Sequence, residues 1–511
     1  MHVNASLNME DGELEPKEIF TDFGISIYEH DKNTWKPVLR QCMICIGVWY
    51  IYLMQGLYLG VSTVLIAQVR REANSTAAIS DEMSSWLSSM PVITALPMIL
   101  ILPWLCYRIG RKYTYFIVCL VSSICYIVFY FSTNLYHVLI GQIFLGASTA
   151  AVNTFTPVLI SEYTSPKYRG ILLTFKSAST FWGIWISNAI GTFFYWKNIS
   201  IVSFTCSLYV LTILTWPESP TWLAMKGRYT ESAKSHRWLK GVNDNSEKEL
   251  AKLITFHKNT KILQILNKND MTNIRKSWFH TAWSIITSRE FYKPGFMCLV
   301  LLAQYHFTGK FVISIYAIEV LKHLTDDEAL TYKAMLILDG VTVVSMYLGC
   351  ILSRYFKRRT LMLLFGSTGI LLLYTMSCYV YLVSRSIVQE NNVLIVCLLS
   401  GFSIATGCGP MIFSSSIYGE IMPSRYQTLI MSATGFGCAT VMAVLLKISP
   451  FMFKTFKMHG TFLFFAICST IIVSYLYIYL PETKNKTVRE IEEHFCGNKS
   501  SEQKRTLLEK R

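Results

Sequence analysis

The sequence predicts an all-α membrane protein whose twelve transmembrane helices form two six-helix halves. Of its 511 residues, 52% are hydrophobic and only 15% are charged, whereas soluble chains typically carry about 25% charged residues. Apolar runs of about 20 residues, the length that crosses a bilayer, recur along almost the whole chain. One long hydrophilic stretch, 217–292, separates two sets of six such runs.

Each half is predicted to contain six spans joined by polar connections. The spans of the first half are expected at 41–68, 86–106, 113–131, 136–160, 171–195 and 199–216. Those of the second half are expected at 294–320, 332–353, 360–383, 392–418, 428–451 and 459–480. The chain thus divides into an N-terminal tail (1–40), a six-helix half (41–216), a central loop with short helices (217–292), a second half (293–480) and a C-terminal tail (481–511).

The distribution of charge predicts the orientation in the membrane. The formal net charge is +15, and Lys and Arg cluster between particular apolar runs, as in 108–112 and 354–359. The central stretch holds thirteen Lys and Arg against seven Asp and Glu. Basic loops stay in the cytoplasm. The protein is therefore expected in the plasma membrane, with both tails and the central loop on its cytoplasmic side. This clustering favours contact with the lipid bilayer and excludes nucleic acid as a partner.

Sequons, cysteines and histidines bear on modification and catalysis. The sequon at Asn74 falls in the first outer loop and is predicted to be glycosylated, with an unused sequon as the alternative. Most of the fourteen cysteines lie in apolar runs, where they act as small hydrophobes. The CxxC of Cys42 and Cys45 has no second pair, so no metal site or cofactor is predicted. The ten histidines form no HExxH or HxxxxD pattern, which excludes an enzyme of those classes.

Three motifs carry a resemblance to a known family. "SEYTSPKYRG" follows the fourth span, "PESPTWLAMKGR" the sixth and "PETKNKTVREIEEHF" the twelfth. With these motifs, about residues 40–495 resemble the sugar porter branch of the major facilitator superfamily, and within it the insect facilitated trehalose transporters. The resemblance implies two halves that rock around a site near the membrane midplane. It also implies a monomer that moves a sugar or sugar-like solute of the trehalose or hexose class by alternating access, as a facilitative uniporter.

The motifs place charged residues at the inner ends of the helices, where the resemblance implies a cytoplasmic latch. Its residues are Arg111, Glu162, Arg169, Glu218, Arg358, Arg359, Glu420 and Glu482. Directional Arg–carboxylate contacts are expected to hold the inner ends of the two halves together in the outward-open state. The alternative is that each pair only anchors loops at the headgroup level. Tyr107 and Gln427 replace a family aspartate and arginine, which weakens the expected latch.

The substrate pocket departs further from the family. In "QYHFTGKFVISIY" (304–316), aligned on Gly309, other side chains replace the family's sugar-binding amides. The candidate solute-binding residues are Ser177, Asn188, Gln304, Tyr305, His306, Thr308, Phe311, Phe413 and Ser415. Because a site that lacks its amides rejects a polyol, two alternatives to a sugar carrier stay open. One is a carrier of a non-sugar amphipathic solute, and the other is a transporter-like sensor or receptor.

Two ionisable residues stand inside predicted spans, Lys310 in the seventh and Asp339 in the eighth. A charge at this depth is costly and usually has a partner in the protein interior. The two residues lie in consecutive spans at matching depth, so an ion pair between them is predicted. A proton-coupling role for Asp339 is the alternative.

Overall fold

The structure is a computed structural model. It describes residues 20, 35–73, 79–270, 287–322, 324, 328–422, 427–484, 491 and 494–495. Within these ranges the chain forms helices and no strand. Eleven of the described helices are long and apolar enough to cross a membrane, which agrees with the predicted all-α membrane protein.

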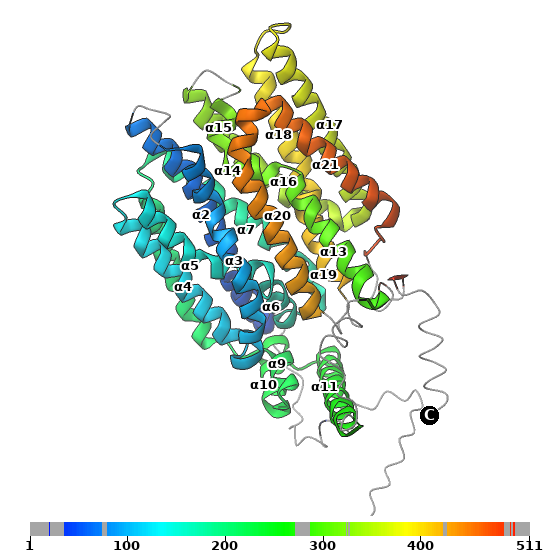
Figure 1. Cartoon of the computed structure of the whole chain (residues 1–511). Helices are drawn as coiled ribbons and strands as arrows, with labels where there is room; N and C mark the ends of the chain where they lie inside the picture. Colours follow the sequence, from blue (N-terminus) through cyan, green and yellow to red (C-terminus); the bar gives the residue numbers. More distant parts are fainter. Residues whose placement is uncertain are drawn as a thin grey trace, which may run out of the picture.

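The first half and the stretch after it follow the predicted order. The helices of the first half are α2 (Trp35–Glu72), α3 (Asp81–Ile109), α4 (Arg111–Phe131), α5 (Leu135–Asn153), α6 (Thr156–Tyr163), α7 (Pro166–Phe193) and α8 (Asn198–Ser207), with the 3₁₀ helix η2 (Leu208–Thr215). Three further helices are α9 (Pro220–Met225), α10 (Tyr229–Lys240) and α11 (Asp244–Asp270). They lie together at one end of the bundle, which is called the inner end below (Figure 1).

The second half contains the remaining helices. They are α13 (Arg289–Phe307), α14 (Lys310–Ile315), α15 (Ala317–Lys322), α16 (Glu328–Tyr355), α17 (Arg358–Ser384), α18 (Asn392–Cys408), α19 (Pro410–Ile421), α20 (Gln427–Thr455) and α21 (Lys457–Tyr479). In Figure 1 the α9–α11 end is lower, and α15 marks the opposite, outer end.

Helix α7 occupies the place of the fifth predicted span but is not among the eleven apolar helices. Its polar side chains, which include Lys176 and Asn188, lower its hydropathy. It packs along α2 in its own half and along α16 in the other half. The count of twelve spans therefore stays a prediction, and α7 is the helix that would complete it.

The seventh predicted span, 294–320, is a broken helix. Gly309 adopts the left-handed conformation with φ of 77°, which a side chain other than glycine rarely tolerates. A Cβ atom at this position would lie 2.8 Å from Phe465 Cγ. The span therefore breaks between α13 and α14, and a second break at Tyr316 separates α14 from α15. Such a discontinuous form is typical of helices that line transporter sites.

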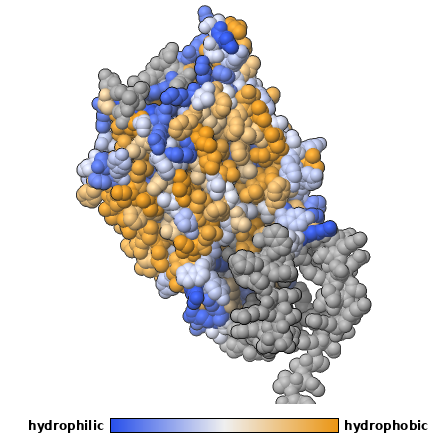
Figure 2. Space-filling view, viewed as in Figure 1, coloured by the Kyte–Doolittle hydropathy of each residue, from blue (hydrophilic) through white to orange (hydrophobic). Residues whose placement is uncertain are grey.

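The outer surface of the bundle suits a lipid environment. Large apolar side chains such as Phe131, Val344 and Leu371 are exposed on it. Figure 2 shows that apolar surface covers the middle of the molecule, while hydrophilic residues gather toward its two ends. In water such a surface would be unstable, whereas in a bilayer it faces hydrocarbon tails.

Candidate functional site

The candidate residues of the seventh span form an aromatic cluster. The ring centroids of Tyr305 and His306 are 5.1 Å apart, and those of Tyr305 and Phe311 are 6.0 Å apart. His306 Nε2 lies 2.9 Å from Cys438 Sγ of α20, so the imidazole is held within the second half. Gln304, which precedes Tyr305 in the sequence, is also buried. Thr308 donates from Oγ1 to the carbonyl of Tyr305 at 3.0 Å and so bonds to its own helix.

Three of the candidates meet across the two halves. The ring of Phe311 packs edge-on against Phe181 of α7, with centroids 6.3 Å apart. Ser177 Oγ of α7 lies 3.3 Å from Ser415 Oγ of α19. These contacts bring residues that lie more than a hundred positions apart to one interface. Phe413 is also buried, but its ring has no ring contact among the described residues.

The predicted direct ion pair between Lys310 and Asp339 does not form in the structure. Lys310 Nζ instead donates to Ser403 Oγ of α18 at 2.9 Å, and Asp339 Oδ2 accepts from Asn188 Nδ2 at 2.7 Å. The two charges interact electrostatically without contact. The prediction rested on the similar depth of the two residues in consecutive spans. It did not foresee that Ser403 of α18 and Asn188 of α7 lie closer to them. Asn188 therefore binds a carboxylate rather than facing an open cavity.

The sequence interpretation overlooked a second buried cation. Lys176 of α7 is 5% exposed, and its Nζ lies 5.8 Å from the ring centroid of Tyr52 in α2. Tyr52 in turn lies near Tyr305 and Tyr418 of the second half. Lys176 therefore belongs to the same central region as the aromatic cluster. The rule that singled out Lys310, a charge inside a span, would have found it.

The inner end of the first half contains a cluster of charged residues built around the start of α4. Arg111 Nη2 lies 3.4 Å from Glu162 Oε1. Glu218 Oε1 accepts from the backbone N–H of Arg111 at 2.9 Å and of Lys112 at 3.1 Å, where the positive end of the helix dipole favours a carboxylate. The pKa of Glu218 is raised, because burial disfavours its charged form more than the same backbone donors stabilise it. Gly110 leaves room for this carboxylate, since a Cβ there would lie 2.3 Å from Glu218 Oε2.

The second half repeats this arrangement around the start of α17. The backbone N–H groups of Arg358 and Arg359 each donate to Glu482 at 3.2 Å. The Arg358 side chain pairs with Glu420, and Arg359 Nη2 donates to the carbonyl of Tyr477. Each cluster thus combines a helix cap with an Arg–carboxylate pair.

The structure changes the prediction of a latch that holds the two halves together. The described ion pairs of the latch arginines stay within one half, Arg111 with Glu162 and Arg358 with Glu420. The physical reason is that each arginine begins a helix whose cap comes from the end of its own half. Among the described residues, Arg169 interacts electrostatically with Glu249 of α11.

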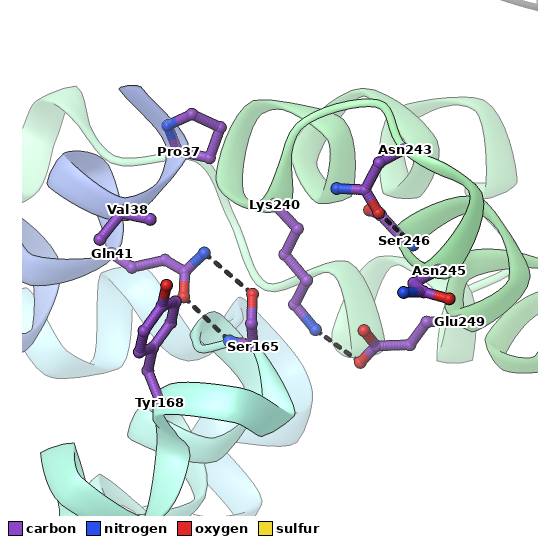
Figure 3. Close-up of a pocket in the computed structure, with 10 residues that line it drawn as sticks. All are labelled: Pro37, Val38, Gln41, Ser165, Tyr168, Lys240, Asn243, Asn245, Ser246 and Glu249. Carbon is purple, nitrogen blue, oxygen red and sulfur yellow. Dashed lines mark hydrogen bonds and ion pairs between the residues drawn. The ribbon is translucent and has the colours of Figure 1, made fainter. Parts of the chain in front are cut away.

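Helices α10 and α11 join the first half at a pocket of about 460 Å³ (Figure 3). Gln41 donates to Ser165 Oγ at 3.0 Å and accepts from the Ser165 N–H at 2.9 Å. Across the pocket, Lys240 Nζ donates to Glu249 Oε1 at 2.6 Å. These groups already bind each other, so we interpret the pocket as a joint between α2, α7 and the α10–α11 pair. The predicted glycosylation site, Asn74, lies outside the described residues.

Comparison with known proteins identifies the family. A family model described as "Sugar (and other) transporter" matches residues 40–495. The chain belongs to the sugar transporter family. It is 27% identical over 427 residues to the facilitated trehalose transporter Tret1 of Bombyx mori, covering 82% of this chain and 80% of that protein. It is also 22% identical over 518 residues to Tret1 of Apis mellifera ligustica, covering 97% and 96% of the two chains.

Solved structures show that this member of the sugar transporter family has the major facilitator fold. The proton:xylose symporter XylE bound to 6-bromo-6-deoxy-D-glucose superposes with a TM-score of 0.73, at 14% identity, over 90% of this chain and 99% of that one. An inward-open XylE from E. coli gives a TM-score of 0.64, also at 14% identity, over 88% of this chain and 99% of that one. The expected resemblance and fold class are therefore confirmed, as is a multi-pass transporter rather than an enzyme.

Proposed function

We propose that this protein is a carrier that moves a sugar or sugar-like solute of the trehalose or hexose class by alternating access. The observation that carries the proposal is the pair of contacts Phe311–Phe181 and Ser177–Ser415. Phe311, Ser177 and Ser415 are expected to bind solute, and both contacts cross the interface between the halves. A solute bound there touches both halves, so rocking of the halves exposes it to one side and then the other. The site is built within one chain, which supports a monomer.

We further propose facilitative uniport. Asp339 is the one acidic residue that is fully buried in the described membrane helices. Its bond from Asn188 links α7 to α16, which supports a structural role for the carboxylate. The names of the Tret1 relatives, which are facilitated transporters, are consistent with uniport.

Uptake into oocytes tests the proposal. The panel contains trehalose, glucose, fructose, polyols and amphipathic glycosides, each with and without a pH gradient. We expect saturable uptake that is stimulated by unlabelled solute on the opposite side and unaffected by the gradient. Solute binding without flux would instead identify a sensor, and uptake driven by the gradient would contradict uniport.

The aromatic cluster favours one alternative, an amphipathic solute. Tyr305, His306 and Phe311 supply ring faces where the family has amides, and ring faces bind apolar bodies as well as sugars. If the solute is amphipathic, an aryl glucoside inhibits uptake more strongly than glucose does. Equal inhibition by the two compounds would favour a plain sugar.

We propose that the protein lies in the plasma membrane with both ends and α9–α11 in the cytoplasm. The basic character of the 217–292 stretch supports this orientation. Epitope tags at the two ends should bind antibody only after the cells are permeabilised. An Asn74→Gln variant should lose the shift in mobility that a glycosidase produces in the unmodified protein. Antibody binding to intact cells would contradict the orientation.

A further inference from the structure

Lys176 is an unusual feature of the membrane interior. It stands five residues after the start of the predicted fifth span, 171–195, which places it about 7.5 Å along the helix axis from the inner boundary of that span. The hydrocarbon core of a bilayer is about 30 Å thick, so Lys176 lies inside the core, on its inner side. The side chain is buried, and among the described residues its Nζ has neither a hydrogen-bond acceptor nor a carboxylate partner.

Of the charged residues that are buried in the described membrane helices, the other two, Lys310 and Asp339, have hydrogen-bond partners. Like Lys176, Lys447 Nζ of α20 has none, but Lys447 is only partly buried and its Nζ lies 3.6 Å from the ring centroid of Trp86. Lys310 donates to Ser403, and Asp339 accepts from Asn188. Lys310 and Asp339 also interact electrostatically with each other, so their charges offset each other. Lys176 is left with the ring of Tyr52, whose face attracts a cation but cannot neutralise its charge.

The position of Lys176 connects it to the solute. The next residue, Ser177, makes the Ser177–Ser415 contact across the halves. The preceding residue, Phe175, packs against Trp49 of α2 and Tyr347 of α16, with ring centroids 5.4 Å and 5.6 Å apart. Lys176 therefore lies in the segment of α7 that contacts α2 of its own half and α16 and α19 of the second half. Buried charges at such positions mark the path of a substrate or an ion.

We propose that Lys176 binds an anionic group of the transported solute, which makes the substrate class a sugar-like carboxylate. This inference rests on the proposed carrier function and deepens it. The Lys176 ammonium would bind the carboxylate. The hydroxyl groups of Ser177 and Ser415 and the rings of Tyr305 and Phe311 would contact the hydroxylated body.

The chemistry of the region favours a single negative charge. Two buried lysines and one buried aspartate leave one uncompensated positive charge among Lys176, Lys310 and Asp339. A monoanion balances it, whereas a phosphate ester brings about two negative charges at neutral pH. Bare burial of the cation is costly, so a carboxylate that neutralises it binds favourably, and an uncharged sugar leaves the cation without a partner.

Uptake of radiolabelled D-glucuronate and D-glucose into oocytes tests the inference. The Lys176→Gln variant removes the charge, Lys176→Arg keeps it, and Lys36→Gln removes a lysine from the exposed start of α2 as the matched control. The amount of each variant at the cell surface is measured by biotinylation. We also measure inhibition of glucose uptake by unlabelled glucuronate in the unmodified protein, which decides the case if Lys176→Gln does not reach the surface.

We expect saturable glucuronate uptake in the unmodified protein. Loss of one partner of a buried charge pair should raise its KM roughly 30-fold or more in Lys176→Gln. Glucose uptake should change little, Lys176→Arg should retain glucuronate uptake, and Lys36→Gln should behave as the unmodified protein does. If glucose moves while glucuronate neither moves nor inhibits, the inference is overturned and the carrier function stands. If no compound of the whole uptake panel moves, both fall.

Discussion

The bond from Asn188 to Asp339 offers the sharpest test of how the two halves interact. Asn188 Nδ2 donates to Asp339 Oδ2 at 2.7 Å, and it joins α7 of the first half to α16 of the second. Both side chains are buried, with 0% and 2% exposure. Replacing Asn188 by alanine removes the donor and leaves a buried carboxylate without it.

The expected magnitude follows from the charge on the acceptor. A hydrogen bond to a charged group contributes about 1.5–3 kcal/mol, which is roughly a 10- to 150-fold change in an equilibrium constant. Neutral hydrogen bonds between membrane helices average about 0.6 kcal/mol. The Ser177–Ser415 contact is neutral and longer, at 3.3 Å, so it serves as the matched control with an expected contribution of about 0.6 kcal/mol or less.

A double-mutant cycle measures the contribution of the pair itself. The variants are Asn188→Ala, Asp339→Ala and their combination, with Ser177→Ala, Ser415→Ala and their combination as the control cycle. The free energy of unfolding is measured by titration with SDS in mixed micelles. The reasoning is refuted if the Asn188–Asp339 coupling energy is no larger than that of the serine pair.

Three further predictions concern the inner end. Gly110→Ala should lower the free energy of unfolding by about 1–3 kcal/mol, because Gly110 has φ of 107° and its Cβ would collide with Glu218; a thermal midpoint equal to that of the unmodified protein would contradict this. Glu482→Gln should lower it by about 0.5–2 kcal/mol through loss of a charged helix cap, whereas Glu231→Gln, which breaks an exposed pair, should have a smaller effect in the same assay. Burial lowers the pKa of His236 from 6.5 to about 3, so the imidazole stays neutral in the folded state, whereas it binds a proton below pH 6.5 in the unfolded state. The free energy of unfolding should therefore fall as the pH is lowered from 6.5 to 3, by about 2 kcal/mol at pH 5. Hydrogen exchange in α10 measures this loss, which should be smaller in His236→Gln.

The general architecture was predictable because it depends on composition and periodicity. A span needs only a long apolar run, so α4, expected at 113–131 and found at Arg111–Phe131, could be located from the sequence. The fifth span shows the limit of this rule. Lys176 and Asn188 lower the hydropathy of α7, which is not among the eleven apolar helices. Its helix is stabilised by packing against α2 and α16, which hydropathy does not measure.

The partners of the charged residues were less predictable. Spacing along the chain placed Arg111 and Glu162 at the same end of the bundle. It did not show whether each arginine pairs within its own half or with the other half. For Lys310 and Asp339, the prediction paired two charges that do interact electrostatically. It missed their hydrogen-bond partners, since Ser403 and Asn188 come from helices far away in the sequence. Motifs therefore locate such residues, while only the packing of the helices decides which atoms meet.

The contrast between contacts within the halves and contacts between them explains how the molecule can move. Within each half, one carboxylate caps the start of α4 or α17, and a second carboxylate pairs with the first arginine of that helix. Each half is therefore held by charge-assisted bonds. Between the halves, several described contacts are weaker, such as the serine pair at 3.3 Å and the edge-on Phe181–Phe311 rings. A motion that separates the halves then breaks mainly neutral contacts and leaves the charged clusters intact. The described contacts between the halves that do involve a charge include the exposed ion pair between Lys454 and Asp81 at 3.5 Å and the buried Asn188–Asp339 bond. Exposed ion pairs contribute little, so breaking the buried Asn188–Asp339 bond should be a larger part of the barrier than any neutral contact, and a solute that contacts both halves lowers that cost.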